Sequence, residues 1–171
     1  MKNTNSFVQK VYNFAFFDKK SSIIWFFVRI YVGWQWLMAG WEKMGTSVWT
    51  GSQHGTALVG YLNGALTKSA GTMPDVSLWY AWLITHIFIP IAPTLSYIVT
   101  FGELAVGVAL ILGIFTGLAA GFGAFMNFNY LFAGTVSINP QLLLLELFLI
   151  KGRKIAGWIG FDRFSKMKEN K

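Results

Sequence analysis

The stretch Thr94–Phe132 reads TLSYIVTFGELAVGVALILGIFTGLAAGFGAFMNFNYLF, and Glu103 is its only acidic or basic residue. A helix that rises 1.5 Å per residue needs about 20 mainly apolar residues to cross a hydrocarbon core of about 30 Å. The stretch is long enough for two such helices, and only Gly113–Thr116 separates them. We therefore expect two membrane spans, over about 94–113 and 116–132, that form a tight helical hairpin.

Two further apolar stretches complete a predicted bundle. One covers about 21–40, and the other covers about 138–150, where Asn139-Pro140 is a plausible helix start. Hydrophobic residues make up 54% of the chain and charged residues 12%, against roughly 25% charged residues in a soluble domain. We expect an all-α fold, an integral membrane four-helix bundle. Within it, Gly117 and Gly121 should let neighbouring helices approach closely.

The charge distribution predicts the orientation, because cytoplasmic loops and tails of membrane proteins are rich in Lys and Arg. Residues 1–20 form a basic arm and residues 153–171 a basic tail, on either side of a single domain over 21–152. We expect a multi-pass protein of the cell membrane with both termini in the cytoplasm. The connection 45–93 then lies outside, and its apolar part, 76–92, is expected to form an interfacial or re-entrant helix because prolines interrupt it.

The formal charge of +7 favours membrane lipids as partners. Its cations lie where orientation and anionic headgroups would place them, and no nucleic-acid motif accompanies them, so we expect no nucleic-acid partner. The chain could also form an oligomer. The chain has no cysteine, which excludes disulfides, thiolate metal sites and thiol nucleophiles within it. It also has no closely spaced histidine pair for a metal, so we expect no metal or covalent cofactor.

Ionisable residues inside the predicted spans are the first candidates for function. Arg29 lies about 12 Å above the cytoplasmic end of its span, and Glu103 and Glu146 lie about 14 Å below the outer ends of theirs. Asn127 reaches a similar level. These depths predict one mid-membrane cluster, which is either a packing network or a proton-conducting or quinone-facing site, since charged groups in a membrane usually pair and often mark function.

A second group of candidates lies nearer the outside. Aromatic rings there could flank a quinone, and polar side chains could bond its carbonyl oxygens, although such aromatics are often only an interfacial belt. The candidates for substrate or quinone binding are Trp36, Lys43, Asn127, Asn129, Asn139 and Gln141.

Three segments of the chain resemble the DoxX family, especially its DoxD branch. They are Arg29–Lys43, Gly102–Gly107 and, most specifically, the Asn-rich Met126–Gln141. The resemblance implies a four-helix membrane protein. It also implies a subunit of a thiosulfate:quinone oxidoreductase, which joins two thiosulfates to tetrathionate and passes the electrons to quinone. Such an enzyme includes a DoxA-like subunit, and no DoxA-like segment is evident in this chain.

Two kinds of function therefore stay open. In the enzymatic hypothesis, Lys43 attracts thiosulfate from outside, quinone enters near Trp36, Asn127 and Asn129, and Glu103 or Glu146 takes up protons. In the alternative, the bundle is a non-catalytic membrane anchor or scaffold for a redox partner, and its buried charges only maintain packing. A small transporter is less attractive because no inverted repeat is evident.

Overall fold

The computed structural model describes residues 2–163, with side chains from residue 6 onward, and these residues form helices and turns with no β-strand among them. The all-α prediction is confirmed for this part of the chain. In order, the elements are α1 (Lys2–Phe17), the 3-10 turn η1 (Lys19–Ser21), α2 (Ser22–Lys43), α3 (Thr56–Thr67), α4 (Leu78–Leu83), the π-helical segment η2 (Ile84–Phe88), α5 (Ala92–Leu112), α6 (Thr116–Phe132), α7 (Asn139–Lys151) and α8 (Arg153–Ala156).

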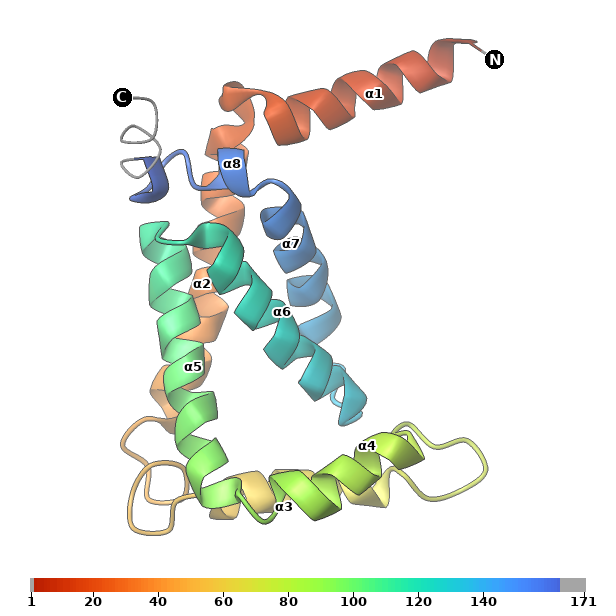
Figure 1. Ribbon diagram of the computed structural model, residues 1–171, viewed down its shortest axis with the longest axis vertical. Helices are drawn as coiled ribbons and strands as arrows, with labels where there is room; N and C mark the ends of the chain where they lie inside the picture. The colour runs from red at the N-terminus through yellow and green to blue at the C-terminus, as the bar shows by residue number, and fades with distance from the viewer. Residues whose placement is uncertain (1, 164–171) are drawn as a thin grey trace.

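The two longest helices, α2 and α5, pack along each other in antiparallel directions (Figure 1). Glycines on both helices make this contact close. A Cβ atom on Gly40 would lie 2.8 Å from the backbone nitrogen of Leu104 and 2.9 Å from the carbonyl oxygen of Thr100. A Cβ atom on Gly33 would lie 3.0 Å from the carbonyl oxygen of Gly107. Only residues without a side chain permit this separation, so these glycines fix the distance and register of the pair.

The second helix pair is α6 with α7, and a sharp turn joins it to α5. Gly113 and Phe115 adopt left-handed backbone angles in this turn, with φ of 69° and 47°. Such a conformation is uncommon for a residue other than glycine. The carboxylate of Asp162 stabilises it, because it accepts hydrogen bonds from the backbone N–H groups of Phe115 and Thr116 at 2.7 and 2.9 Å. These N–H groups are at the start of α6 and have no partner within the helix.

The long connection between α2 and α5 folds across one end of the bundle, where α3 and the α4–η2 segment lie roughly crosswise to the other helices (Figure 1). Leu58, Leu62, Val76, Tyr80 and Ile84 form a separate apolar core beneath them. The expected helix within 76–92 is present as α4 and η2. The sequence analysis did not anticipate α3.

The helices α1 and α8 lie together at the opposite end (Figure 1). The Phe16 ring of α1 packs against Trp25 of α2 and Phe148 of α7, with ring centroids 5.5 and 6.2 Å apart. The Trp25 indole also donates a 2.6 Å hydrogen bond to the carbonyl oxygen of Ala15. The beginning and the end of the described chain are therefore on the same side of the bundle.

The predicted ranges agree with the observed helices to within a few residues. The range 116–132 coincides with α6, the ranges 94–113 and 138–150 match α5 and α7, and α2 continues past the predicted 21–40 as far as Lys43. The prediction about Gly121 was wrong, because a Cβ atom there would meet no atom within 4 Å. Gly117 does lie close to a neighbouring helix, since a Cβ atom there would lie 3.0 Å from Cβ of Arg153 in α8. The close approach of helix backbones occurs on α2 and α5.

The distribution of side chains on α6 is the reverse of that expected in a soluble bundle. Its outward positions carry large apolar side chains, whereas its buried positions are mainly small or polar. Exposed are Leu118, Phe122, Phe125, Phe128 and Phe132; buried are Thr116, Ala119, Ala120, Gly123, Ala124 and Asn127. Soluble monomers rarely expose apolar patches of such extent.

Two helical segments, Lys19–Lys43 and Ala92–Leu112, are long and apolar enough to cross a membrane. The helices α6 and α7 have 17 and 13 residues. At 1.5 Å per residue they extend about 26 and 20 Å, less than a hydrocarbon core of about 30 Å. The expectation of four spans is therefore confirmed only as two helices of sufficient length.

Replacing Gly40 tests the close approach of α2 and α5. Gly40→Ala should lower the free energy of unfolding by about 1–3 kcal/mol, because overpacking forces backbone to move. Gly121→Ala is the matched control, since it adds the same methyl group to a helix where nothing lies within 4 Å. Thermal unfolding of the detergent-solubilised proteins, followed by circular dichroism, measures both. Equal melting temperatures for the two variants would contradict the packing described here.

Candidate functional site

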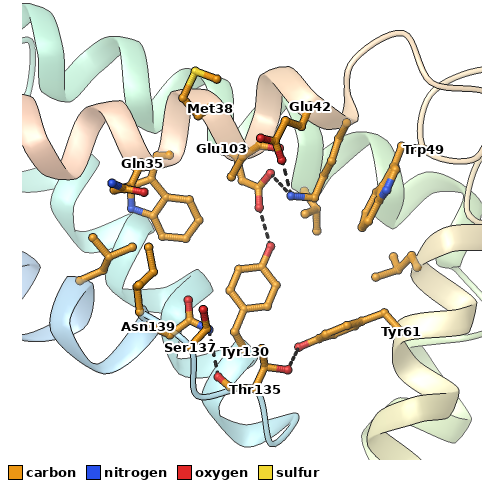
Figure 2. Close-up of a pocket in the computed structure, with 17 residues that line it drawn as sticks. Gln35, Met38, Glu42, Trp49, Tyr61, Glu103, Tyr130, Thr135, Ser137 and Asn139 are labelled. Carbon is orange, nitrogen blue, oxygen red and sulfur yellow. Dashed lines mark hydrogen bonds and ion pairs between the residues drawn. The ribbon is translucent and has the colours of Figure 1, made fainter.

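A cavity of about 410 Å³ lies between the α2–α5 pair, α3 and the loop that joins α6 to α7 (Figure 2). This is within the range of small-molecule sites. Its wall is largely apolar and aromatic, with a few polar groups. The lining residues are Gln35, Trp36, Met38, Ala39, Glu42, Lys43, Trp49, Leu58, Tyr61, Val99, Glu103, Tyr130, Thr135, Ser137, Ile138, Asn139 and Leu142.

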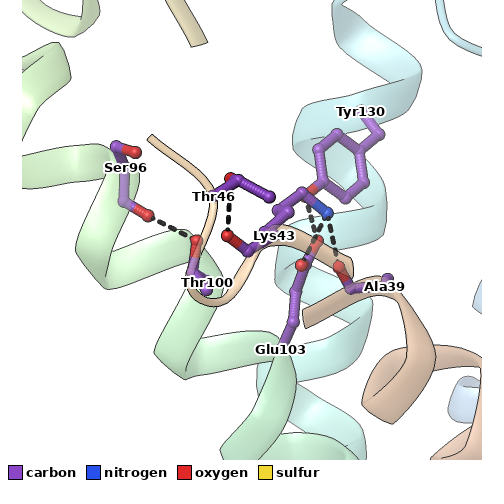
Figure 3. A network of polar contacts seen from close by, with 7 residues as sticks. All are labelled: Ala39, Lys43, Thr46, Ser96, Thr100, Glu103 and Tyr130. Carbon is purple, nitrogen blue, oxygen red and sulfur yellow. Dashed lines mark hydrogen bonds and ion pairs between the residues drawn. The ribbon is translucent and has the colours of Figure 1, made fainter. Parts of the chain in front are cut away.

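The main polar group of the cavity is a network of Lys43, Glu103 and Tyr130 (Figure 3). The Lys43 ammonium lies 2.7 Å from Oε2 of Glu103 and also donates to the carbonyl oxygen of Ala39 at 3.1 Å. The Tyr130 hydroxyl donates a 2.6 Å hydrogen bond to Oε1 of Glu103. Glu103 is 1% exposed. Both of its carboxylate oxygens thus have donors, as burial of a charged group requires.

Helix packing brings these three residues together from three elements. Lys43 is the last residue of α2, Glu103 lies in the middle of α5, and Tyr130 is in the last turn of α6. The contact of Gly40 with Thr100 and Leu104 sets the end of α2 beside Glu103. A wider separation of α2 and α5 would leave the carboxylate without its cation.

A second polar group surrounds Glu146, which is fully buried. The Trp36 indole donates to its Oε1 at 2.6 Å, and the Asn127 amide donates to its Oε2 at 2.7 Å. Gly123 makes room for this arrangement, because a Cβ atom there would lie 3.0 Å from the Trp36 nitrogen. Among the described residues, Glu146 has no cation partner, and Oδ1 of Asn127 has no hydrogen-bond donor.

One aromatic contact connects the two carboxylate groups. The rings of Trp36 and Tyr130 stack with centroids 6.3 Å apart and an interplanar angle of 24°. Trp36 bonds Glu146 and Tyr130 bonds Glu103, while both rings line the cavity. A ligand that touches these two rings would therefore be one hydrogen bond away from either carboxylate.

Arg29 does not join these carboxylates, so the prediction of a single four-residue cluster was wrong. Its guanidinium donates to the carbonyl oxygens of Ala156 and Ile159, at 3.3 and 2.6 Å, and interacts electrostatically with Asp162. Arg29 is one turn above Trp25, whereas Lys43 is at the other end of the same helix. The predicted depths assumed that every helix runs perpendicular to the membrane and begins at the same level. They also could not anticipate that residues 156–162 fold back over this end of the bundle.

Of the predicted binding residues, Trp36, Lys43 and Asn139 line the cavity. The Asn139 amide donates to the carbonyl oxygen of Thr135 at 2.9 Å. Asn129 braces the outer segment instead, because its Oδ1 accepts a 3.1 Å hydrogen bond from the Tyr80 hydroxyl. Gln141 is exposed and does not belong to the lining. The structure therefore retains Trp36, Lys43, Glu103 and Asn139 at the cavity, with Asn127 and Glu146 behind Trp36.

Several lining residues, above all Tyr130, were not among the predicted site residues. Tyr130 lies three residues after Asn127, and this spacing, which is visible in the sequence, places both on one face of a helix. Trp49 and Tyr61 belong to the long connection, and nothing in the sequence locates them at the site. Burial raises the pKa of Tyr61, an effect that its hydrogen bond with Thr135 partly offsets, so this phenol stays protonated at neutral pH.

Within residues 2–163, no group of three or more His, Cys, Asp or Glu side chains is arranged to hold a metal ion. Comparisons of the chain with protein-family models, with curated proteins and with solved structures found no match.

The contacts of Arg29 can be tested by two double-mutant cycles. Arg29→Met should lower the free energy of unfolding by about 1–3 kcal/mol, because it leaves the carbonyl oxygens of Ala156 and Ile159 without this donor. Its effect should be non-additive with Asp162→Asn by about 0.5–3 kcal/mol, and additive with Glu103→Gln, since contacting residues couple and distant ones do not. Chemical unfolding in detergent provides the free energies of the six proteins: the wild type, the three single variants and the two double variants. Coupling to Glu103→Gln instead of Asp162→Asn would restore the single-cluster hypothesis.

Proposed function

We propose that this chain is a multi-pass membrane protein with both termini in the cytoplasm, in which α2, α5, α6 and α7 cross or enter the bilayer. The exposed apolar face of α6 and the apolar lengths of α2 and α5 support a lipid environment. The position of α1 and α8 at one end, near Lys10, Lys151 and Arg153, supports a cytoplasmic location for that end. The shorter α7 would then require local adjustment of the bilayer.

We further propose that the bundle is the quinone-binding subunit of a membrane redox complex, of the kind that the resemblance to DoxX and DoxD proteins implies. The observation that carries this proposal is the cavity whose stacked Trp36 and Tyr130 rings lie next to a buried carboxylate. A quinone needs flat apolar walls for its ring and hydrogen-bonding groups for its two oxygens. Asn139 supplies an amide N–H donor at the cavity wall, and the Tyr130 hydroxyl oxygen supplies an acceptor for the O–H of the reduced quinol.

The chemistry requires protons as well as electrons. Joining two thiosulfates to tetrathionate releases two electrons, and reduction of a quinone to a quinol consumes these electrons together with two protons. Glu103 lines the cavity and hydrogen-bonds Tyr130, so a proton taken up by this carboxylate would reach a bound quinone directly or through the Tyr130 hydroxyl. Glu146 lies behind the Trp36 indole, which does not relay protons, so its part in the proposal is to orient Trp36 at the cavity wall. General acid–base groups must lie within hydrogen-bond reach of the atom they protonate, directly or through one intermediate group. The thiosulfate site would belong to a DoxA-like chain or another redox partner.

The alternative function is a non-catalytic anchor or scaffold for a redox partner. It is favoured by the fact that both buried carboxylates already have donors from the protein, which is what a packing network needs. In that case the polar groups fix helix rotation, and the cavity is incidental.

Turnover separates these functions. The complex purified with its partners should reduce a soluble quinone analogue with thiosulfate. Glu103→Gln and Asn127→Ala should each lower kcat per folded complex at least about tenfold at a temperature well below melting, since a proton-transfer group typically contributes 10²–10⁴-fold. Each should also lower the melting temperature, because Lys43 or Glu146 loses a buried partner. Asn63→Ala, at an exposed position of α3, is the control for Asn127→Ala and should change neither quantity.

A scaffold would give the reverse pattern, with activity proportional to the amount of folded complex and insensitive to these side chains. Absence of bound quinone, together with absence of thiosulfate-dependent reduction in the presence of every co-purifying partner, would reject the catalytic proposal.

Single-cysteine labelling tests the orientation, because the chain has no cysteine of its own. In intact cells, a membrane-impermeant maleimide should label Ser52→Cys, in the exposed connection before α3, and should leave Ser6→Cys and Arg163→Cys unlabelled until the membrane is opened. These three positions are exposed in the structure, so accessibility within the protein is matched. Labelling of Arg163→Cys in intact cells would show an odd number of crossings.

A further inference from the structure

The cavity carries one unbalanced negative charge. Its lining includes three side chains with a formal charge, Lys43, Glu103 and Glu42. Lys43 and Glu103 form an ion pair at 2.7 Å, so their charges sum to zero wherever the proton between them resides. Glu42 is exposed at the cavity wall, and no further cation belongs to the lining. A ligand in the cavity therefore meets a net formal charge of one negative unit.

The ammonium of Lys43 is already engaged by protein groups, which an incoming anion would have to displace. A lysine has three N–H donors. One is directed to Glu103 and one to the carbonyl oxygen of Ala39, and the ammonium lies 5.1 Å from the centre of the Trp49 ring. An anion would have to compete with a buried carboxylate for this cation, and separating that pair would leave Glu103 uncompensated.

The helix ends around the cavity do not reverse this charge. α2 ends at Lys43 and α6 ends at Phe132, while α3 begins at Thr56, two residues before the lining residue Leu58, and α7 begins at Asn139. Two carbonyl ends and two amide ends therefore lie around the cavity and offset each other. Carbonyl ends carry partial negative charge and amide ends partial positive charge. Just outside the lining, Lys68 and Asp75 both lie against Gly134, and their opposite charges cancel.

We infer that the cavity selects uncharged ring compounds over anions and that Glu42 sets this selectivity. The inference rests on the proposed quinone site and identifies its ligand class. A neutral quinol fits, because the Tyr130 hydroxyl directs its proton to Glu103 and leaves its oxygen able to accept from a quinol O–H. A neutral quinone fits because Asn139, which uses one amide N–H on Thr135, has a second N–H for a quinone carbonyl oxygen. Thiosulfate, a dianion, does not enter this cavity, so Lys43 is not its binding residue and its oxidation occurs on a partner chain.

A matched pair of tricyclic quinones provides the test. Binding of neutral hydroxymethylanthraquinone and of anionic anthraquinone sulfonate to the purified protein in detergent is measured by titration calorimetry at low salt. Glu42→Gln should raise the affinity of the sulfonate relative to the neutral compound roughly three- to tenfold, as expected for removal of one exposed charge near the ligand. This gain should vanish at about 1 M salt, where the screening length is about 3 Å. Partition of the two probes into the detergent micelle is the same for every variant, so it cancels when the ratio of their affinities is compared between variants.

Two control variants accompany it. Glu42→Asp keeps the charge, and Asp75→Asn removes an exposed carboxylate that is outside the lining; both should leave the ratio unchanged. An unchanged ratio in Glu42→Gln, or displacement of the neutral probe by thiosulfate, would overturn the charge selection and leave the quinone site standing. Failure of both compounds to bind would overturn the quinone site and this inference together.

Discussion

The close contact of α2 with α5 is the constraint on which the rest of the structure depends. Gly33, Gly40 and Gly107 remove side chains from this contact, so that the backbones of the two helices nearly touch. Neutralisation of Glu103 follows from this approach, because Lys43 can reach the carboxylate only when the end of α2 lies against the middle of α5. A buried charge without its partner would cost several kcal/mol. A packing feature made of glycines therefore decides whether the polar site can exist.

The buried polar groups are divided among three places. Lys43 and Tyr130 satisfy Glu103 at the cavity, Trp36 and Asn127 satisfy Glu146 within the bundle, and Arg29 holds the C-terminal part of the described chain at the opposite end. This division gives the groups different consequences for function. The first two are connected through the stacked rings of the cavity, whereas Arg29 has a role in docking residues 156–162 and none at the cavity.

An uncharged ligand and a charged electron donor place opposite demands on one site. A cavity suited to a quinone must be flat and apolar, while a dianion needs unpaired cations or amide groups to replace its hydration. The Lys43–Glu103 pair has no net charge, and Glu42 adds a negative charge to the lining. In the proposed function, a division of labour between this chain and a partner would resolve the conflict, since each site would then need to suit only one kind of molecule.

The sequence by itself determined the helices of the bundle, because continuous apolar stretches of a given length fix where a helix can be buried or face lipid. It also marked Glu103, Glu146 and Asn127 as buried polar residues. Their partners were decided only by the tertiary structure. A count of residues along a helix gives depth but neither rotation nor neighbours, so Arg29 was grouped with the carboxylates although it contacts Ala156 and Ile159.

The cavity itself also depended on the tertiary structure. The long connection between α2 and α5 has no periodic pattern strong enough to place Trp49 or Tyr61, and they reach the cavity only because α3 folds across the end of the bundle. Contacts between residues far apart in the chain follow from how helices pack. The residue pattern of one segment predicts a helix but does not predict which other helices it packs against.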